Sequence, residues 1–99
     1  MVQSSVTAND IATVERWLQE YPELAHIRVR KRGQILILDS GPKNDPIPHT
    51  RLRRTPRGQW AVEMPSGSRW EATPFENPKL EPLLELVREA FGWMLTPIL

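Results

Sequence analysis

The fold is decided by residues 26–38, whose sequence is HIRVRKRGQILIL. Apolar and basic residues alternate from position 27 to position 30, which predicts a strand with one buried face. Gly33 permits the tight turn that follows, and the uniformly apolar residues 35–38 predict a central strand covered on both faces. Two strands joined by such a short turn predict an antiparallel sheet.

A helix is predicted before this hairpin, and Pro22 ends it because proline cannot continue a helix. Thr7 and Asp10 have the spacing of a capping box, in which each side chain bonds the backbone N–H of the other residue. Residues 1–6 precede this signal, and we expect them to form a loose tail. Apolar residues recur at helical intervals, at Ile11, Val14, Trp17, Leu18 and Tyr21.

Three more short strands are predicted after the hairpin, at residues 50–54, 60–64 and 69–73. A proline-rich loop at residues 39–48 precedes them, and turns at residues 55–58 and 65–68 separate them. Trp60 and Trp70 share the strand parity of their apolar neighbours, so we expect both indole rings in the core.

A second helix closes the domain, and we predict that its regular part starts at about Pro82, because a residue before proline disfavours the helical conformation. The predicted fold is therefore one α+β domain over residues 1–99, with an antiparallel sheet of four to five strands. The sequence leaves open whether this sheet stays open or curls strongly. Both helices are expected to pack on one sheet face through Ile11, Val14, Trp17, Leu18, Leu83, Leu84, Val87 and Phe91.

The charged residues are sorted along the chain, although the formal net charge is only +1. Between positions 26 and 60, nine basic residues face two acidic ones, which gives that stretch a charge of +7. The rest of the chain holds four basic and ten acidic residues, which gives −6. A basic segment between acidic flanks produces a positive field that the net charge hides, and it suggests an anionic partner.

We expect the basic residues to share an exposed sheet face, because residues two apart in a strand point to the same side. Arginine binds phosphates and carboxylates through paired hydrogen bonds, so this face suits a nucleic-acid backbone or an acidic protein. The alternative is a solvated face with arginine–glutamate pairs that involve Glu63 or Glu71. The predicted partner-binding residues are Arg28, Arg30, Lys31, Arg32, Arg51, Arg53 and Arg57.

The sequence shows no signature of catalysis or metal binding. It contains no cysteine, which excludes disulfides, thiolate zinc sites and cysteine nucleophiles. His26 and His49 lack a second ligand pair at a metal-binding spacing. Ser66 lies between two predicted strands, whereas a nucleophile elbow joins a strand to a helix. We therefore expect no enzyme activity, no cofactor and no metal.

Residues 93–99 include five apolar side chains, more than a small core usually absorbs at the end of a chain. The simpler interpretation is a tail that packs on its own sheet. The alternative is a contact with a second copy or with another protein. The residues of that contact would be Trp93, Met94, Leu95 and Ile98.

The stretch from Arg51 to Leu95 resembles a family of small bacterial proteins of unknown function. The resemblance is carried by Arg51-Leu52-Arg53, Trp60 to Met64-Pro65, Arg69-Trp70-Glu71 and Thr73-Pro74-Phe75, followed by a leucine-rich helix and an aromatic tail. It implies no activity, and no catalytic or binding residue is carried over from it.

The sequence favours a small non-catalytic binding module whose basic sheet face meets a nucleic acid or an acidic protein. A structural subunit that assembles through its C-terminal tail, as a homodimer for instance, is the alternative, and an enzyme is third. The longest apolar run, at residues 35–38, is too short to span a bilayer, and the polar N-terminus lacks a signal-peptide pattern. We expect a soluble, cytoplasmic protein without membrane contact.

Overall fold

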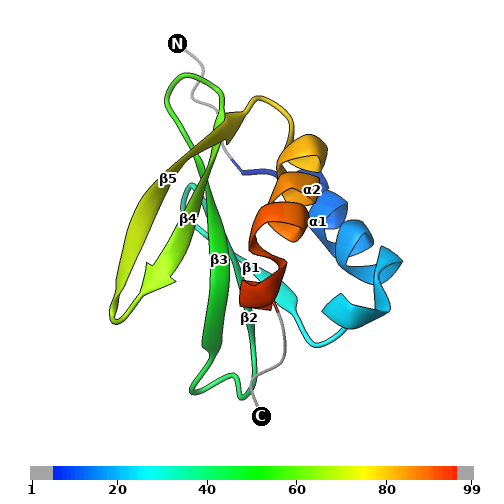
Figure 1. The fold of residues 1–99 in the computed structure, drawn as a ribbon. Coiled ribbons are helices and arrows are strands. Elements are labelled where there is room, and N and C mark those ends of the chain that lie inside the picture. The colour runs from blue at the N-terminus through cyan, green and yellow to red at the C-terminus, as the bar shows by residue number, and fades with distance from the viewer. Residues whose placement is uncertain (1–5, 96–99) are drawn as a thin grey trace.

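Both helices of the molecule lie on one face of a five-stranded antiparallel sheet (Figure 1). The computed structural model describes residues 6–95, apart from the side chains of Trp93 and Met94. The strands follow in sequence order from edge to edge, and they are β1 (Arg28–Arg32), β2 (Ile35–Ser40), β3 (Ile47–Arg54), β4 (Trp60–Ser66) and β5 (Arg69–Asn77). The helical segments are α1 (Ala8–Glu20), η1 (Pro22–Leu24), α2 (Leu80–Phe91) and η2 (Gly92–Leu95), η1 and η2 being 3-10 turns. The predicted α+β fold is confirmed, and the sheet is not closed.

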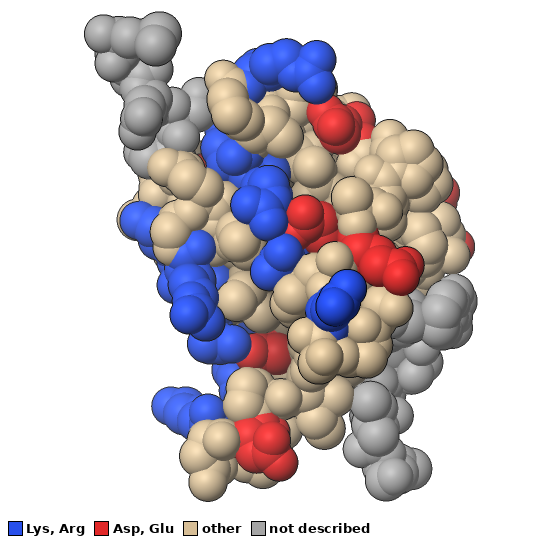
Figure 2. Space-filling view, turned by 90° about the vertical axis from the view of Figure 1, so that its left-hand side faces the viewer, with Lys and Arg blue, Asp and Glu red and all other residues tan. Residues whose placement is uncertain are grey.

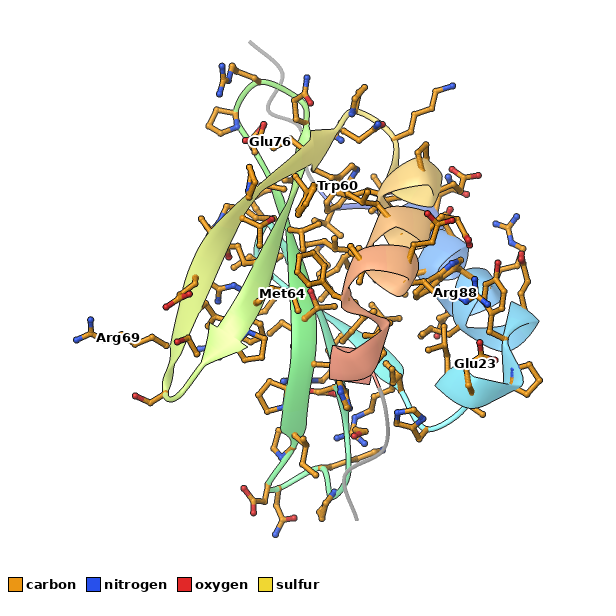
Figure 3. All side chains as sticks on the ribbon, in the orientation of Figure 1. Glu23, Trp60, Met64, Arg69, Glu76 and Arg88 are labelled. Carbon is orange, nitrogen blue, oxygen red and sulfur yellow. The ribbon has the colours of Figure 1, made fainter. Side chains whose placement is uncertain are left out.

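The core fills the space between the helices and the inner face of the sheet, which is the face towards them. Leu36, Leu52 and Val62 are cross-strand neighbours on β2, β3 and β4, and all three are fully buried. Trp60 and Met64 belong to the same face of β4 and lie between the sheet and the helices (Figure 3). The helices bury Val14, Trp17, Leu18, Leu83, Leu84 and Val87 here, with Ile11 and Phe91 half-buried at the margin, which confirms the predicted helix contacts.

Helix α1 begins as its sequence predicts. The Thr7 hydroxyl accepts from the backbone N–H of Asp10 at 3.2 Å, and the Asp10 carboxylate accepts from the backbone N–H of Thr7 at 2.8 Å. This capping box satisfies two N–H groups that have no partner inside the helix. Val6, which the sequence placed in the loose tail, is 3% exposed and belongs to the core, whereas residues 1–5 lie outside the described residues.

Helix α2 starts at Leu80, two residues before the predicted start, so Glu81 is helical although it precedes Pro82. Pro82 occupies the third helical position, where a backbone N–H would have no acceptor within the helix. Proline therefore costs no hydrogen bond there, and the prediction from Pro82 was wrong. The Asn77 side chain accepts from the backbone N–H of Lys79 at 2.9 Å and shapes the approach to the helix.

A polar contact joins the two helices at the edge of the core. Glu85 of α2 accepts hydrogen bonds from Trp17 Nε1 at 2.7 Å and from the Tyr21 hydroxyl at 2.8 Å. These bonds lower the pKa of Glu85, and the bond to Glu85 raises the pKa of Tyr21. The Arg88 guanidinium lies 3.8 Å from the centre of the Tyr21 ring and pairs with Glu23 at 3.3 Å (Figure 3). The sequence did not identify this contact.

The strands are longer than the sequence predicts. β3 starts at Ile47 instead of residue 50, and β5 continues to Asn77 instead of ending at residue 73. Pro48 lies opposite Asp39, next to a register shift after Leu38, where the strand pairing is irregular. Prolines are tolerated at such bulges and on edge strands, so they do not mark the strand ends here.

Candidate functional site

Five of the seven predicted partner-binding residues share the outer face of the sheet, which is the face opposite the helices. Arg30 lies opposite Ile37 and Ile37 lies opposite Arg51, so these three side chains point to the same side. The same register places Arg32 opposite Ile35, and Ile35 opposite Arg53. Figure 2 shows the basic side chains gathered along this face. We call it the arginine face, and it consists of Arg28, Arg30, Arg32, Arg51 and Arg53.

Two predicted residues lie elsewhere. Lys31 is opposite Leu36, a core residue, so its side chain points to the helix side of the sheet, where it is exposed. Arg57 is an exposed residue of the turn between β3 and β4. Neither forms an ion pair with a described residue.

A buried carboxylate lies beneath one side of the arginine face. Asp39 ends the apolar run of β2 and is only 1% exposed. Arg28 Nε approaches Asp39 Oδ1 to 3.0 Å, and Arg30 reaches Oδ2 with both Nε and Nη2 at 2.8 Å. Arg28 also donates from Nη1 to the carbonyl of Gly41 at 2.7 Å. A buried charge needs such partners, and two guanidinium groups supply them here.

A second carboxylate lies beneath the other side. Glu63 of β4 is opposite Arg51 of β3, and its side chain is 13% exposed. Arg51 Nε donates to Oε1, and Arg53 donates to Oε2 from Nε at 3.1 Å and to Oε1 from Nη2 at 3.2 Å. Burial by itself raises the pKa of Glu63, but hydrogen bonds from Arg53 and Arg51, with their positive charges, leave it below its ordinary value of 4.5.

Trp70 lies at the margin of the arginine face, so its predicted place in the core was wrong. It is half-buried and opposite Pro65, and the Arg51 guanidinium lies 4.6 Å from the centre of its ring. Gly67 and Ser68 form a two-residue turn that pairs Ser66 with Arg69 and thereby fixes which face Trp70 occupies. A cation over an indole ring is a favourable contact, so the Arg51 guanidinium stabilises the Trp70 ring at a position outside the core.

Two histidines that the sequence treated as unremarkable are packed together near η2. The rings of His26 and His49 lie edge to face with their centres 5.5 Å apart. His26 Nε2 donates to the carbonyl of Leu95 at 2.7 Å, and His49 Nε2 shares a hydrogen bond of 2.7 Å with the Ser40 hydroxyl. Ser40 and His49 are 6% and 1% exposed, so this hydrogen-bonded pair is buried. Within residues 6–95, no three His, Asp or Glu side chains are grouped to hold a metal ion.

The predicted self-association contact is placed only in part. Leu95 is 2% exposed and packs in the core of its own domain, as the simpler interpretation of the tail expects. The side chains of Trp93 and Met94, and all of Ile98, lie outside the described residues. Self-association through this tail therefore stays a prediction.

Comparison with known proteins found no matching family model, no similar curated protein and no similar solved structure. The resemblance of residues 51–95 to a family of small bacterial proteins therefore stays a prediction. Neither of the helices in the described part of the chain has the length and apolar character needed to cross a membrane.

Proposed function

We propose that this chain is a small, non-catalytic binding module of the cytoplasm whose arginine face recognises an anionic partner, either a nucleic-acid backbone or an acidic protein. The main support is that the arginine side chains are more exposed to solvent than the carboxylates with which they pair. Asp39 and Glu63 are 1% and 13% exposed, whereas Arg28, Arg30 and Arg53 are 31%, 45% and 41% exposed. An approaching partner therefore meets these three guanidinium groups before it meets Asp39 or Glu63.

The ion pairs position the arginines without cancelling them. Glu76 of β5 is opposite Ala61 and therefore also lies on this face, so five arginines and three carboxylates leave it with a formal charge of +2. Arg30 and Arg53 each use Nε and Nη2 for their carboxylate, while a guanidinium has five N–H donors, so donors remain for a ligand. A side chain that is already held in place loses less conformational entropy when it binds.

The test uses a variant, called the thinned variant, that lacks three of the five arginines of this face but keeps one arginine paired with each buried carboxylate. Replacing all four paired arginines by alanine would strand both Asp39 and Glu63. The variant Arg30→Gln/Arg32→Gln/Arg53→Gln instead lowers the formal charge of the face from +2 to −1, and Arg28 and Arg51 still hold Asp39 and Glu63. The matched control removes three basic charges on the helix side of the molecule, in the variant Arg16→Gln/Lys79→Gln/Arg88→Gln.

Binding of poly-L-glutamate and of a mixed-sequence single-stranded oligonucleotide is measured for each protein over a salt series. Three phosphate contacts give a slope of about −2 for log affinity against log salt with a single strand. We expect the wild type and the control variant to bind at least one probe, and the thinned variant to bind about tenfold or more weakly at low salt. Equal affinities of the thinned and control variants for both probes would refute the proposed function.

A further inference from the structure

The two edges of the sheet differ in how they can pair with another strand. Strand β5 contains Pro74, which has no backbone N–H to donate, and its pairing with β4 shifts register between Ala61 and Glu63. Both features blunt an edge against added strands. Strand β1 has neither proline nor bulge, and it pairs in unbroken register with β2 alone. The β1 edge is therefore the one that suits strand addition.

The register shows which backbone groups β1 presents at this edge. The backbone N–H of Arg54 donates to the carbonyl of Gln34 at 2.8 Å, so even-numbered residues of β2 bond towards β3. Odd-numbered residues of β2 therefore bond towards β1, and their partners are Arg28, Arg30 and Arg32. The N–H and C=O groups of Val29 and Lys31 then point outward, and no hydrogen bond among the described residues uses them.

An apolar groove runs beside this edge on the helix side of the sheet. It has a volume of about 430 Å³ and lies between α1, η1 and the start of β1. Its apolar lining is provided by Leu18, Leu24, Ile27 and Val29. In a strand added next to β1, every second side chain would point to the helix side, where this groove begins.

The charges of β1 decide which strand fits. Arg28, Arg30 and Arg32 point to the outer face at two-residue spacing, next to the other side chains of an added strand. A second copy of β1 would bring arginines beside arginines, and like charges on neighbouring strands repel. Acidic residues at alternate positions would instead form cross-strand ion pairs with all three arginines.

We propose that the β1 edge binds an extended segment of another protein, in which acidic and apolar residues alternate, as a sixth strand of the sheet. Its acidic side chains pair with Arg28, Arg30 and Arg32, and its apolar side chains enter the groove beside Val29. Backbone bonds to Val29 and Lys31 supply the pairing itself, as in other peptides that add a strand to a sheet edge. This inference rests on the proposed function and names the class of anionic partner.

The first test uses a substitution that blocks the edge. Lys31→Pro removes an outward N–H at an edge position, where proline does not disturb the bonds to β2, and Lys31→Gln is its charge-matched control. The probe is a labelled eight-residue peptide in which glutamate and valine alternate. We expect Lys31→Gln to bind like the wild type within about threefold, and Lys31→Pro to bind at least about tenfold more weakly, with an unchanged circular dichroism spectrum. Equal binding by both variants would overturn the strand addition.

The second test does not depend on any variant folding. A peptide of the same composition, with its four glutamates grouped before its four valines, has the same charge but cannot direct the two residue types to opposite faces. We expect the alternating peptide to bind at least about tenfold more tightly than the grouped one. Equal affinities of the two peptides would overturn the inference. So would a single-stranded oligonucleotide that binds more tightly than the alternating peptide and whose affinity Lys31→Pro leaves unchanged. The proposed function would still stand in that case if the thinned variant Arg30→Gln/Arg32→Gln/Arg53→Gln lost affinity relative to its control.

Discussion

Asp39 is the most deeply buried charge of the arginine face. We therefore expect the free energy of unfolding to fall strongly when the two arginines that pair with Asp39 are removed. Its carboxylate forms ion pairs with Arg28 and Arg30. The variant Arg28→Ala/Arg30→Ala removes both ion-pair partners of this carboxylate, which is 1% exposed in the wild type. Stranding a buried charge in this way costs about 3–5 kcal/mol. That is a large part of the roughly 5–15 kcal/mol expected for a domain of this kind.

A third substitution separates the charge from the packing. Asp39→Asn in the same background replaces the stranded carboxylate by a neutral amide of nearly the same shape. An unpaired neutral polar group costs only about 1–3 kcal/mol. The triple variant should therefore be more stable than the double variant by about 2 kcal/mol, although it carries one more substitution.

Urea denaturation at pH 7, followed by tryptophan fluorescence, measures this difference. With a denaturant slope of about 1–3 kcal/mol/M, a gap of about 2 kcal/mol places the triple variant's midpoint about 1 M above that of the double variant. If the triple variant unfolds at the same urea concentration as the double variant, or at a lower one, then a stranded carboxylate is not what destabilises the protein and the reasoning is refuted.

Two further predictions concern acid and the core. Because contacts in the folded protein lower the pKa of Glu63 and Glu85, their stabilisation is complete above the ordinary value of 4.5 and is lost as the pH falls through the folded values. The free energy of unfolding should therefore fall less steeply below pH 4.5 in Glu63→Gln/Glu85→Gln than in the wild type, and parallel curves would contradict this. Leu52 is fully buried on the central strand, so Leu52→Ala should lower the free energy of unfolding by about 3–5 kcal/mol, which urea denaturation measures; a loss below about 1 kcal/mol would show that its neighbours close the cavity.

The fold could be predicted because its signals are local. The change of hydrophobic period at residues 26–38 reflects strands that bury one face, and the structure has β1 and β2 there. The capping residues Thr7 and Asp10 are three positions apart and need no distant partner to act. The core-facing side of each helix could also be predicted, since each helix has one apolar stripe and that stripe packs on the sheet.

The features that the sequence did not identify depend on contacts between distant segments. Trp70 was assigned to the core by parity, but only the register set by the turn at residues 67–68 and the position of Arg51 determine its face. The hydrogen bonds of Glu85 join residues 64 and 68 positions apart in sequence, and no local pattern reports them. The alternative of arginine–glutamate pairs correctly named Glu63, because a cross-strand neighbour is the one distant contact that strand order predicts.

The sequence left two interpretations of the basic face, a surface that binds an anionic partner and a solvated surface with arginine–glutamate pairs. The paired arginines show how both can hold. The ion pairs with Asp39 and Glu63 are part of the fold, yet Arg30 and Arg53 are far more exposed than the carboxylates with which they pair. A face built in this way combines a fixed geometry with a positive surface, and both properties favour binding of an anion.

The central claim, that an anionic partner contacts the arginine face, is tested most directly by nuclear magnetic resonance during titration with octaglutamate at low salt. The Nε–Hε signals of the arginines report each guanidinium separately, and Arg16 and Arg88 serve as internal controls because they belong to α1 and α2, on the opposite side of the sheet. We predict that the signals of Arg30, Arg32 and Arg53 shift with one common affinity and that added salt reverses the shifts. Shifts confined to Arg16 and Arg88, or no shifts at all, would contradict the claim.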